Sequence, residues 1–110
     1  MSIFDKIASN EESKFALEAQ HEFKAEARRN KYLAKWAADL FGYDEDKTSK
    51  YILEVIASDM EEAGDDDVFR KLRADFDKEG YEMTDSALRA KMTECLYQAR
   101  NEVHDELYGE

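Results

Sequence analysis

Apolar and small side chains recur every three or four residues along most of this chain, and the period-two alternation typical of β-strands is missing throughout. Glycines at 42, 64 and 80 divide the pattern, and glycine accepts the positive φ at which helices commonly end. The pattern predicts helices over about residues 11–41, 44–64 and 65–80, and from 84 toward the C-terminus. Asp44 and Thr84 are suited to cap two of their N-termini.

Each predicted helix has an apolar stripe that we expect to face a shared core. In the first, two neighbouring rows contain Phe23, Ala27, Ala34, Ala37 and Phe41, and Leu33, Trp36 and Leu40. In the second, the stripe contains Ile52, Val55, Ile56, Met60 and Ala63. In the third it contains Val68, Phe69, Leu72 and Phe76, and in the fourth Leu88, Met92, Cys95, Leu96, Ala99, Val103 and Leu107. Asn30 falls within the first row, where a buried amide needs hydrogen-bond partners.

The 110 residues include no proline, the strongest helix breaker, so an all-α fold is expected. Short connections favour antiparallel packing of neighbouring helices. The first residues are less regular, because Ser9 and Asn10 favour caps and turns, and Phe15 and Leu17 fall on different sides of a helix. We therefore predict a mobile N-terminal segment, residues 1–18, followed by a four-helix bundle-like domain, residues 19–110.

Sixteen basic residues against 27 acidic ones give a net charge of −11, which disfavours nucleic acid and anionic lipid as partners. The charge is uneven, since residues 42–67 hold ten acids and two bases, whereas residues 21–41 hold five bases and three acids. Cys95 is the only cysteine, so no internal disulfide can form. Neither a signal peptide nor a membrane-spanning apolar run is evident. These features predict a soluble cytoplasmic protein.

Candidate chemistry is sparse. Glu18 and His21 have the spacing of a di-iron ligand pair, but the other histidine, His104, follows Asn101 and not a carboxylate, so no metal site is expected. Cys95 lies on an apolar stripe, where a structural role is the simpler interpretation. Neither a catalytic triad motif nor a glycine-rich phosphate loop occurs. The chain is therefore expected to be no enzyme and to need no cofactor.

One basic patch stands out on the first predicted helix, formed by Arg28, Arg29, Lys31 and Lys35. The simpler interpretation is a solvated face that balances the acidic second helix. The alternative is a clamp for the carboxylates of an acidic partner or for the phosphates of a nucleotide.

Two long strings resemble a known family. Residues 23–31 read FKAEARRNK and are followed by Trp36-Ala37-Ala38, and residues 59–76 read DMEEAGDDDVFRKLRADF. Both strings, in this order and spacing, resemble the inhibitor subunit zeta family of bacterial F-type ATP synthases. The resemblance covers nearly the whole chain.

This resemblance implies a monomeric, non-catalytic protein whose N-terminal segment becomes helical inside the catalytic head of the ATP synthase and blocks ATP hydrolysis. It would place the protein at the membrane only peripherally, through that complex. The residues expected to touch the head are Phe4, Asp5, Ile7, Glu12, Lys14 and Phe15.

The chain departs from the family pattern at two of its N-terminal positions. Members usually have a basic residue where Ile7 stands and an aromatic one where Glu11 stands. A helical module that docks on the same complex or on another protein without inhibiting it, and a weak nucleotide sensor that uses Arg28, Arg29 and Lys31, are therefore the alternatives to an inhibitor.

Overall fold

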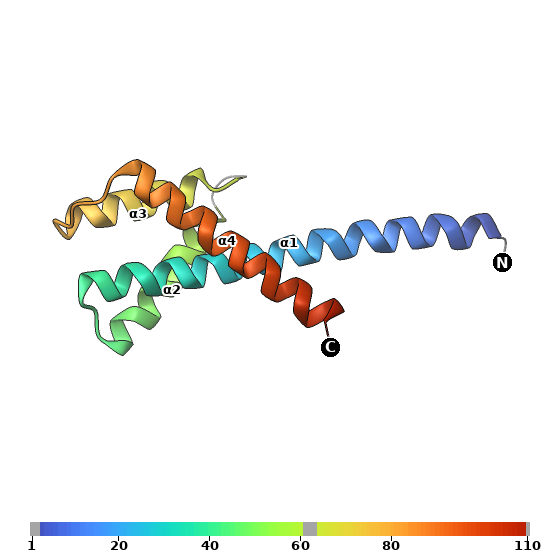
Figure 1. Cartoon of the computed structure of the whole chain (residues 1–110), viewed down its shortest axis with the longest axis horizontal. Helices are drawn as coiled ribbons and strands as arrows, with labels where there is room; N and C mark the ends of the chain where they lie inside the picture. Colours follow the sequence, from blue (N-terminus) through green and yellow to red (C-terminus); the bar gives the residue numbers. More distant parts are fainter. Residues whose placement is uncertain (1–2, 61–63, 110) are drawn as a thin grey trace.

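The computed structural model describes residues 3–60 and 64–109, with side chains from residue 17 onward. This part of the chain contains four helices and no strand: α1 (Ile3–Phe41), α2 (Glu45–Ser58), α3 (Asp66–Lys78) and α4 (Asp85–Tyr108) (Figure 1). The predicted all-α, four-helix architecture is confirmed.

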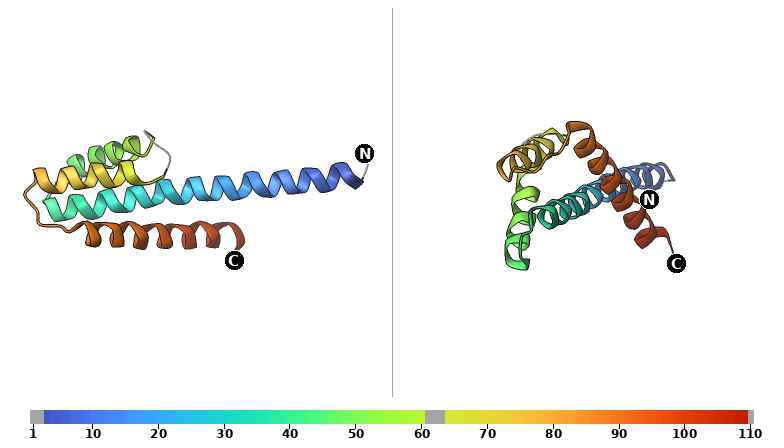
Figure 2. Two further views of the ribbon diagram at one scale, coloured as in Figure 1. Left: turned by 90° about the horizontal axis from the view of Figure 1, so that it is seen from above. Right: turned by 60° about the vertical axis from the view of Figure 1, so that its left-hand side comes forward.

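Helix α1 is the axis of the molecule and contacts each of the other three helices. α2 and α3 pack beside its C-terminal half, and α4 runs back along it in the opposite direction (Figure 2). Toward its N-terminus α1 continues past the ends of the other helices (Figure 1), so the molecule measures 63 × 31 × 25 Å. The structure is therefore a bundle at one end and a single helix at the other.

The helix ends follow the capping rules that the sequence indicated. The Asp44 carboxylate accepts a hydrogen bond from the Lys47 backbone N–H at 2.8 Å, and the Thr84 hydroxyl accepts one from the Ala87 N–H at 3.1 Å. Gly42 has a φ of 76°, a conformation that costs other residues energy, and it ends α1 as expected.

Two predicted boundaries were wrong. α1 begins at Ile3 and not near residue 11, because Ser9 and Asn10 lower helix stability by only about half a kcal/mol each and neither proline nor glycine interrupts residues 3–41. α2 ends at Ser58 and not at Gly64: the last turn tightens, with the Met60 N–H bonding to the Ala57 carbonyl oxygen three residues back, and the Asp59 side chain contacts α1 at this point. That residues 1–18 are mobile in the isolated protein stays a prediction.

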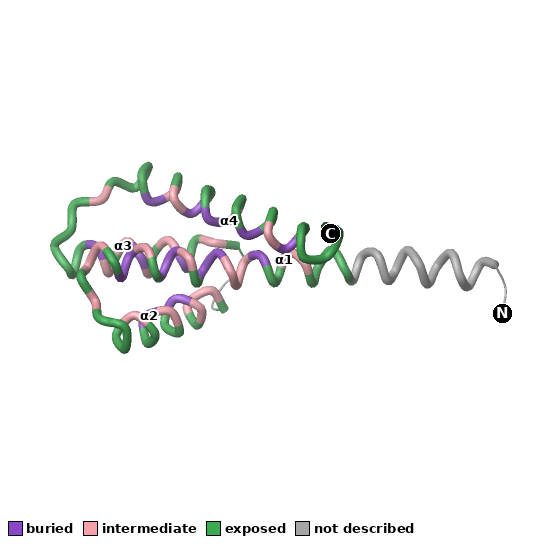
Figure 3. The backbone as a smooth tube through the Cα atoms, turned by 60° about the horizontal axis from the view of Figure 1, so that its bottom comes forward, coloured by how far each residue is buried: buried purple, intermediate pink, exposed green. Residues whose placement is uncertain are grey.

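The core lies between α1, α2, α3 and α4, and Figure 3 marks the buried positions of these helices in purple. Phe76 is fully buried, and its ring lies 4.8 Å from that of Phe41, 5.5 Å from that of Trp36 and 5.6 Å from that of Tyr81, centroid to centroid. The other fully or nearly buried apolar residues of this cluster are Leu33, Ala34, Ala37, Ala38, Tyr51, Val55, Val68, Leu72, Leu88, Met92 and Cys95. Counting Phe76, ten of the predicted stripe residues belong to this cluster. Five more are partly buried against it: Trp36, Leu40, Phe41, Ile52 and Phe69.

Three predicted core positions are exposed instead. Phe23 is 72% exposed, because α1 packs on α4 at this level through Ala25, which points to nearly the opposite side of the helix. Met60 is 81% exposed, because it follows the end of α2, whose buried residues are Tyr51 and Val55. Leu107 is also partly exposed near the end of α4, and Ala63 lies outside the described residues.

Candidate functional site

The basic patch predicted on α1 is divided by the fold. Arg28 points toward α4, where its guanidinium lies 2.6 Å from the Glu106 carboxylate and 3.5 Å from that of Glu102. The hydrogen bond between Arg28 and Glu106 makes the largest contribution to both of their pKa shifts: it raises the pKa of Arg28 and lowers that of Glu106. Arg28 therefore stays charged and joins the two longest helices.

Arg29 points into the molecule, where it is only 3% exposed. Its Nη2 lies 3.4 Å from an Asp59 carboxylate oxygen, and its Nε donates to the Asn30 side-chain oxygen at 3.0 Å. The buried Asn30 amide in turn donates to Asp59 at 2.8 Å, which supplies the partner that the sequence required. These contacts fix the end of α2 against α1, so Arg29 does not face solvent.

Lys31 and Lys35 are exposed. Lys31 lies with Arg28 in an open groove of about 710 Å³, whereas Lys35 lies outside the residues that line it. The floor of the groove is α1, and its walls come from the ends of α2 and α4. We call it the α1 groove; its lining residues are Phe23, Lys24, Ala27, Arg28, Lys31, Tyr32, Ile56, Glu102 and Glu106.

The Glu102 carboxylate on the α4 wall of this groove is held by neighbouring side chains. The Tyr32 hydroxyl donates a hydrogen bond to it, and Gln98 donates another at 3.1 Å. The hydrogen bond from Tyr32 is the main cause that lowers the pKa of Glu102. The wall is therefore an ordered set of ionised groups.

The sequence analysis missed the contribution of Phe23 and Lys24 to this groove. Lys24, Arg28, Lys31 and Lys35 follow one another at intervals of four, three and four residues, which places them along one side of α1. This spacing was the signal that could have separated the exposed cations from Arg29.

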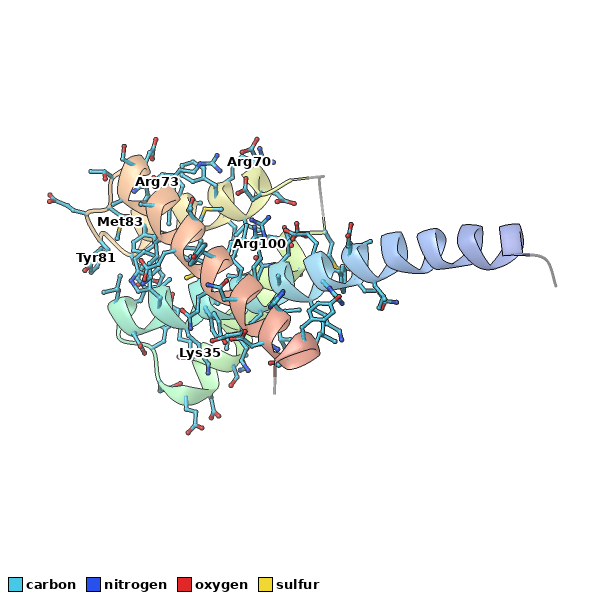
Figure 4. All side chains as sticks on the ribbon, turned by 45° about the vertical axis from the view of Figure 1, so that its right-hand side comes forward. Lys35, Arg70, Arg73, Tyr81, Met83 and Arg100 are labelled. Atoms are coloured by element: carbon cyan, nitrogen blue, oxygen red, sulfur yellow. The ribbon has the colours of Figure 1, made fainter. Side chains whose placement is uncertain are left out.

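The side chains of Phe4, Asp5, Ile7, Glu12, Lys14 and Phe15 lie outside those that the structure describes. Their backbone belongs to the first turns of α1. No residue from 17 to 24 is buried, and near the point where α1 leaves the bundle an ion pair joins Glu22 to Arg100 of α4 at 2.6 Å (Figure 4 labels Arg100).

The sequence profile of the family described as ATPase inhibitor subunit zeta matches residues 1–102 of this chain. The chain belongs to that family. A solved structure titled "Solution NMR structure of the protein" is 39% identical, with a TM-score of 0.66, and the match covers 77% of this chain and 96% of that chain. No curated protein matched the chain. The predicted family is thus confirmed, and with it a role in the inhibitor class.

The remaining features of this zeta-family chain supply little catalytic chemistry. Cys95 is buried, and burial raises the pKa of its thiol, which fits the structural role expected for it. The rings of His21 and Tyr108 meet edge to face at 5.7 Å. Among the described residues, no three side chains of the metal-ligating kinds cluster together, and no helix is long and apolar enough to cross a membrane.

A second hollow, of about 590 Å³, lies at the connection between α3 and α4 of this zeta-family protein. Arg73 lines it and donates hydrogen bonds to the Met83 carbonyl oxygen and to the carboxylates of Asp77 and Asp85, at 2.8 and 3.1 Å for the carboxylates (Figure 4 labels Arg73 and Met83). The bonds to Met83 and Asp85 tie the connection and the start of α4 to α3, so we assign this hollow a structural role.

Proposed function

We propose that this protein inhibits ATP hydrolysis by an F-type ATP synthase by inserting its N-terminal segment, residues 1–18, into the catalytic head. The observation that supports the proposal most is the extension of α1 beyond the bundle, on a chain of the zeta family. The buried residues that the structure describes all lie between Ala25 and Val103, so the segment can enter a partner without dismantling the core.

The dimensions of the molecule suit a narrow helix that enters a groove and a wider bundle that stays outside it. Residues 3–18 span about 24 Å as a helix roughly 10–12 Å wide, which can enter a groove between subunits. The bundle behind it belongs to a molecule whose two shorter dimensions are 31 and 25 Å, so the bundle is too wide to follow. The depth of insertion would then be set where α1 meets α4, near the clamp between Glu22 and Arg100.

Phe4, Ile7 and Phe15 are the apolar side chains that would be buried in the head. Each contributes roughly 1.5–3 kcal/mol when fully removed from water, which offsets the cost of ordering the segment. Asp5, Glu12 and Lys14 would make the polar contacts that fix its register. The loss of a buried aromatic anchor at Glu11 predicts weaker binding than in members that have one.

The test is a turnover assay with the detergent-solubilised cognate ATP synthase. We expect the full chain to slow ATP hydrolysis more than synthesis, and a chain shortened to residues 18–110 to leave hydrolysis unchanged. Circular dichroism during urea unfolding serves as the control that the shortened chain remains folded. If both chains slow hydrolysis equally, the segment is not the effector and the proposal is wrong.

Co-purification with the enzyme without any change in turnover would select the alternative, a non-inhibitory docking module. A specific observation supports that alternative: the bundle itself exposes the α1 groove, which is separate from the N-terminal segment.

A further inference from the structure

We infer that the α1 groove binds an acidic amphipathic helix of the ATP synthase head and so anchors the bundle on the outside of the complex. This inference rests on the proposed function for the identity of the complex that supplies the helix. It adds a second contact, on the folded bundle, to the contact made by residues 1–18.

The apolar part of the groove is unusually open to solvent. Phe23, at 72% exposure, lines it together with Ala27 of α1 and the partly buried Ile56 of α2. An adjoining hollow shares these three residues and adds Met60, which is 81% exposed. Large apolar side chains gathered on one surface of a small protein mark an interaction site more often than chance exposure.

The charges of the groove identify the kind of partner. Its lining carries three cations against two carboxylates, on a chain whose net charge is −11. Both carboxylates, Glu102 and Glu106, already bind Arg28. Lys31 forms no ion pair with any residue that the structure describes. The lining of the groove therefore has an excess of one positive charge on an acidic protein, although the adjoining hollow also contains Glu26 and Asp59. This local excess favours an acidic ligand.

The arrangement of these cations favours a helix as the ligand. Lys24, Arg28 and Lys31 follow one side of α1 over about 10 Å, the length of two helical turns, and Lys35 continues the row beyond the groove. A helix lying along α1 would present carboxylates at the same three- and four-residue intervals to this row and its apolar ridge to Phe23 and Met60. A second copy of the chain is a poor occupant, because two molecules of charge −11 repel each other.

The position of the groove places this partner on the head. Phe23 follows residue 18 by five residues of the same helix, a distance of about 8 Å. With residues 1–18 inserted, the groove would stand at the mouth of the insertion site. Two contacts on one continuous helix reinforce each other, because the first to form holds the second in place.

Two full-length variants test the inference. F23S/M60S removes the apolar contact, and K24E/K31E reverses the charge of the two lysines in the groove. Y97S and K47E/K50E are matched controls, since Tyr97 is a 70% exposed aromatic on α4 and the two control lysines are exposed on α2. Binding to the solubilised ATP synthase is measured by fluorescence anisotropy at several salt concentrations. We expect each groove variant to bind at least about tenfold more weakly and each control to bind within twofold of wild type. K24E/K31E should also reduce the dependence of binding on salt.

The outcomes separate this inference from the proposed function. Groove variants that bind and inhibit like wild type overturn the inference and leave the inserted segment as the effector. Groove-dependent binding without slower hydrolysis supports the inference and overturns the proposed inhibition. Absence of binding by the wild-type chain overturns both. Sedimentation that shows a wild-type dimer and a monomeric F23S/M60S would make the groove a self-association surface, which also overturns the inference.

Discussion

Asn30 in α1 donates a hydrogen bond of 2.8 Å to the carboxylate of Asp59, the residue that follows the last turn of α2. The same carboxylate lies 3.4 Å from the buried guanidinium of Arg29. One acidic side chain thus satisfies a buried amide and neutralises a buried charge, and it joins the end of α2 to α1. Both partners come from the basic string that carries the family resemblance, which gives that string a structural meaning.

Asp59→Ala should lower the free energy of unfolding by about 2 kcal/mol or more, because it leaves Arg29 charged, buried and without its carboxylate. Asp77→Ala is the matched control. Asp77 also pairs with an arginine, at 2.8 Å, but its side chain is 67% exposed, so its loss should cost less than about 1 kcal/mol. Urea unfolding followed by circular dichroism measures both. Equal losses would mean that the buried pair contributes no more than a surface one.

The helices could be predicted from the sequence because their signals are local. Caps such as Asp44 and Thr84 and the regular stripe of α4 depend on residues a few positions apart. The contact between the end of α2 and α1 could not be predicted, since it joins Asp59 to residues 29 and 30 positions earlier in the chain. Phe23 was misplaced for a similar reason: its helical row is apolar, but the crossing of α4 over α1 selects Ala25 instead.

Phe76→Ala should lower the free energy of unfolding by about 3–5 kcal/mol, because the side chain is fully buried among three aromatic rings. Phe23→Ala removes the same atoms from a side chain that is 72% exposed, and its effect should be within about 0.5 kcal/mol. The two free energies come from parallel urea titrations. A large loss for Phe23→Ala would contradict its placement at the surface.

Stability should fall between pH 10 and 12 partly through Tyr43. Burial, followed by the hydrogen bond to Glu79, raises the pKa of this phenol from 10 to about 12 in the folded protein. Because the folded state holds the proton more tightly, the stabilisation is complete below pH 10 and is lost as the pH rises through the folded pKa. Tyr43→Phe cannot ionise and should lose less stability over this range. Tyr97→Phe, at a 70% exposed position, should follow wild type in the same titrations.

Less of the candidate site than of the fold could be predicted. The sequence marked Arg28, Arg29, Lys31 and Lys35 as one patch, because they are close along the chain. Neighbouring residues on a helix point about 100° apart, so only the tertiary packing shows that Arg29 turns inward and Arg28 toward α4. The N-terminal contact residues were assigned by family resemblance, and they stay a prediction.

Ser9→Ala/Asn10→Ala should make the protein a stronger inhibitor if residues 1–18 fold on binding. Each change favours helix by about half a kcal/mol, so the concentration for half-maximal inhibition should fall about fivefold. Ser49→Ala/Asn101→Ala is the control, since these exposed residues lie in α2 and α4, whose formation does not accompany binding; it should inhibit like wild type. Titration of ATP hydrolysis by the solubilised enzyme measures both. An unchanged midpoint for the first variant would show that the segment gains no helix on insertion.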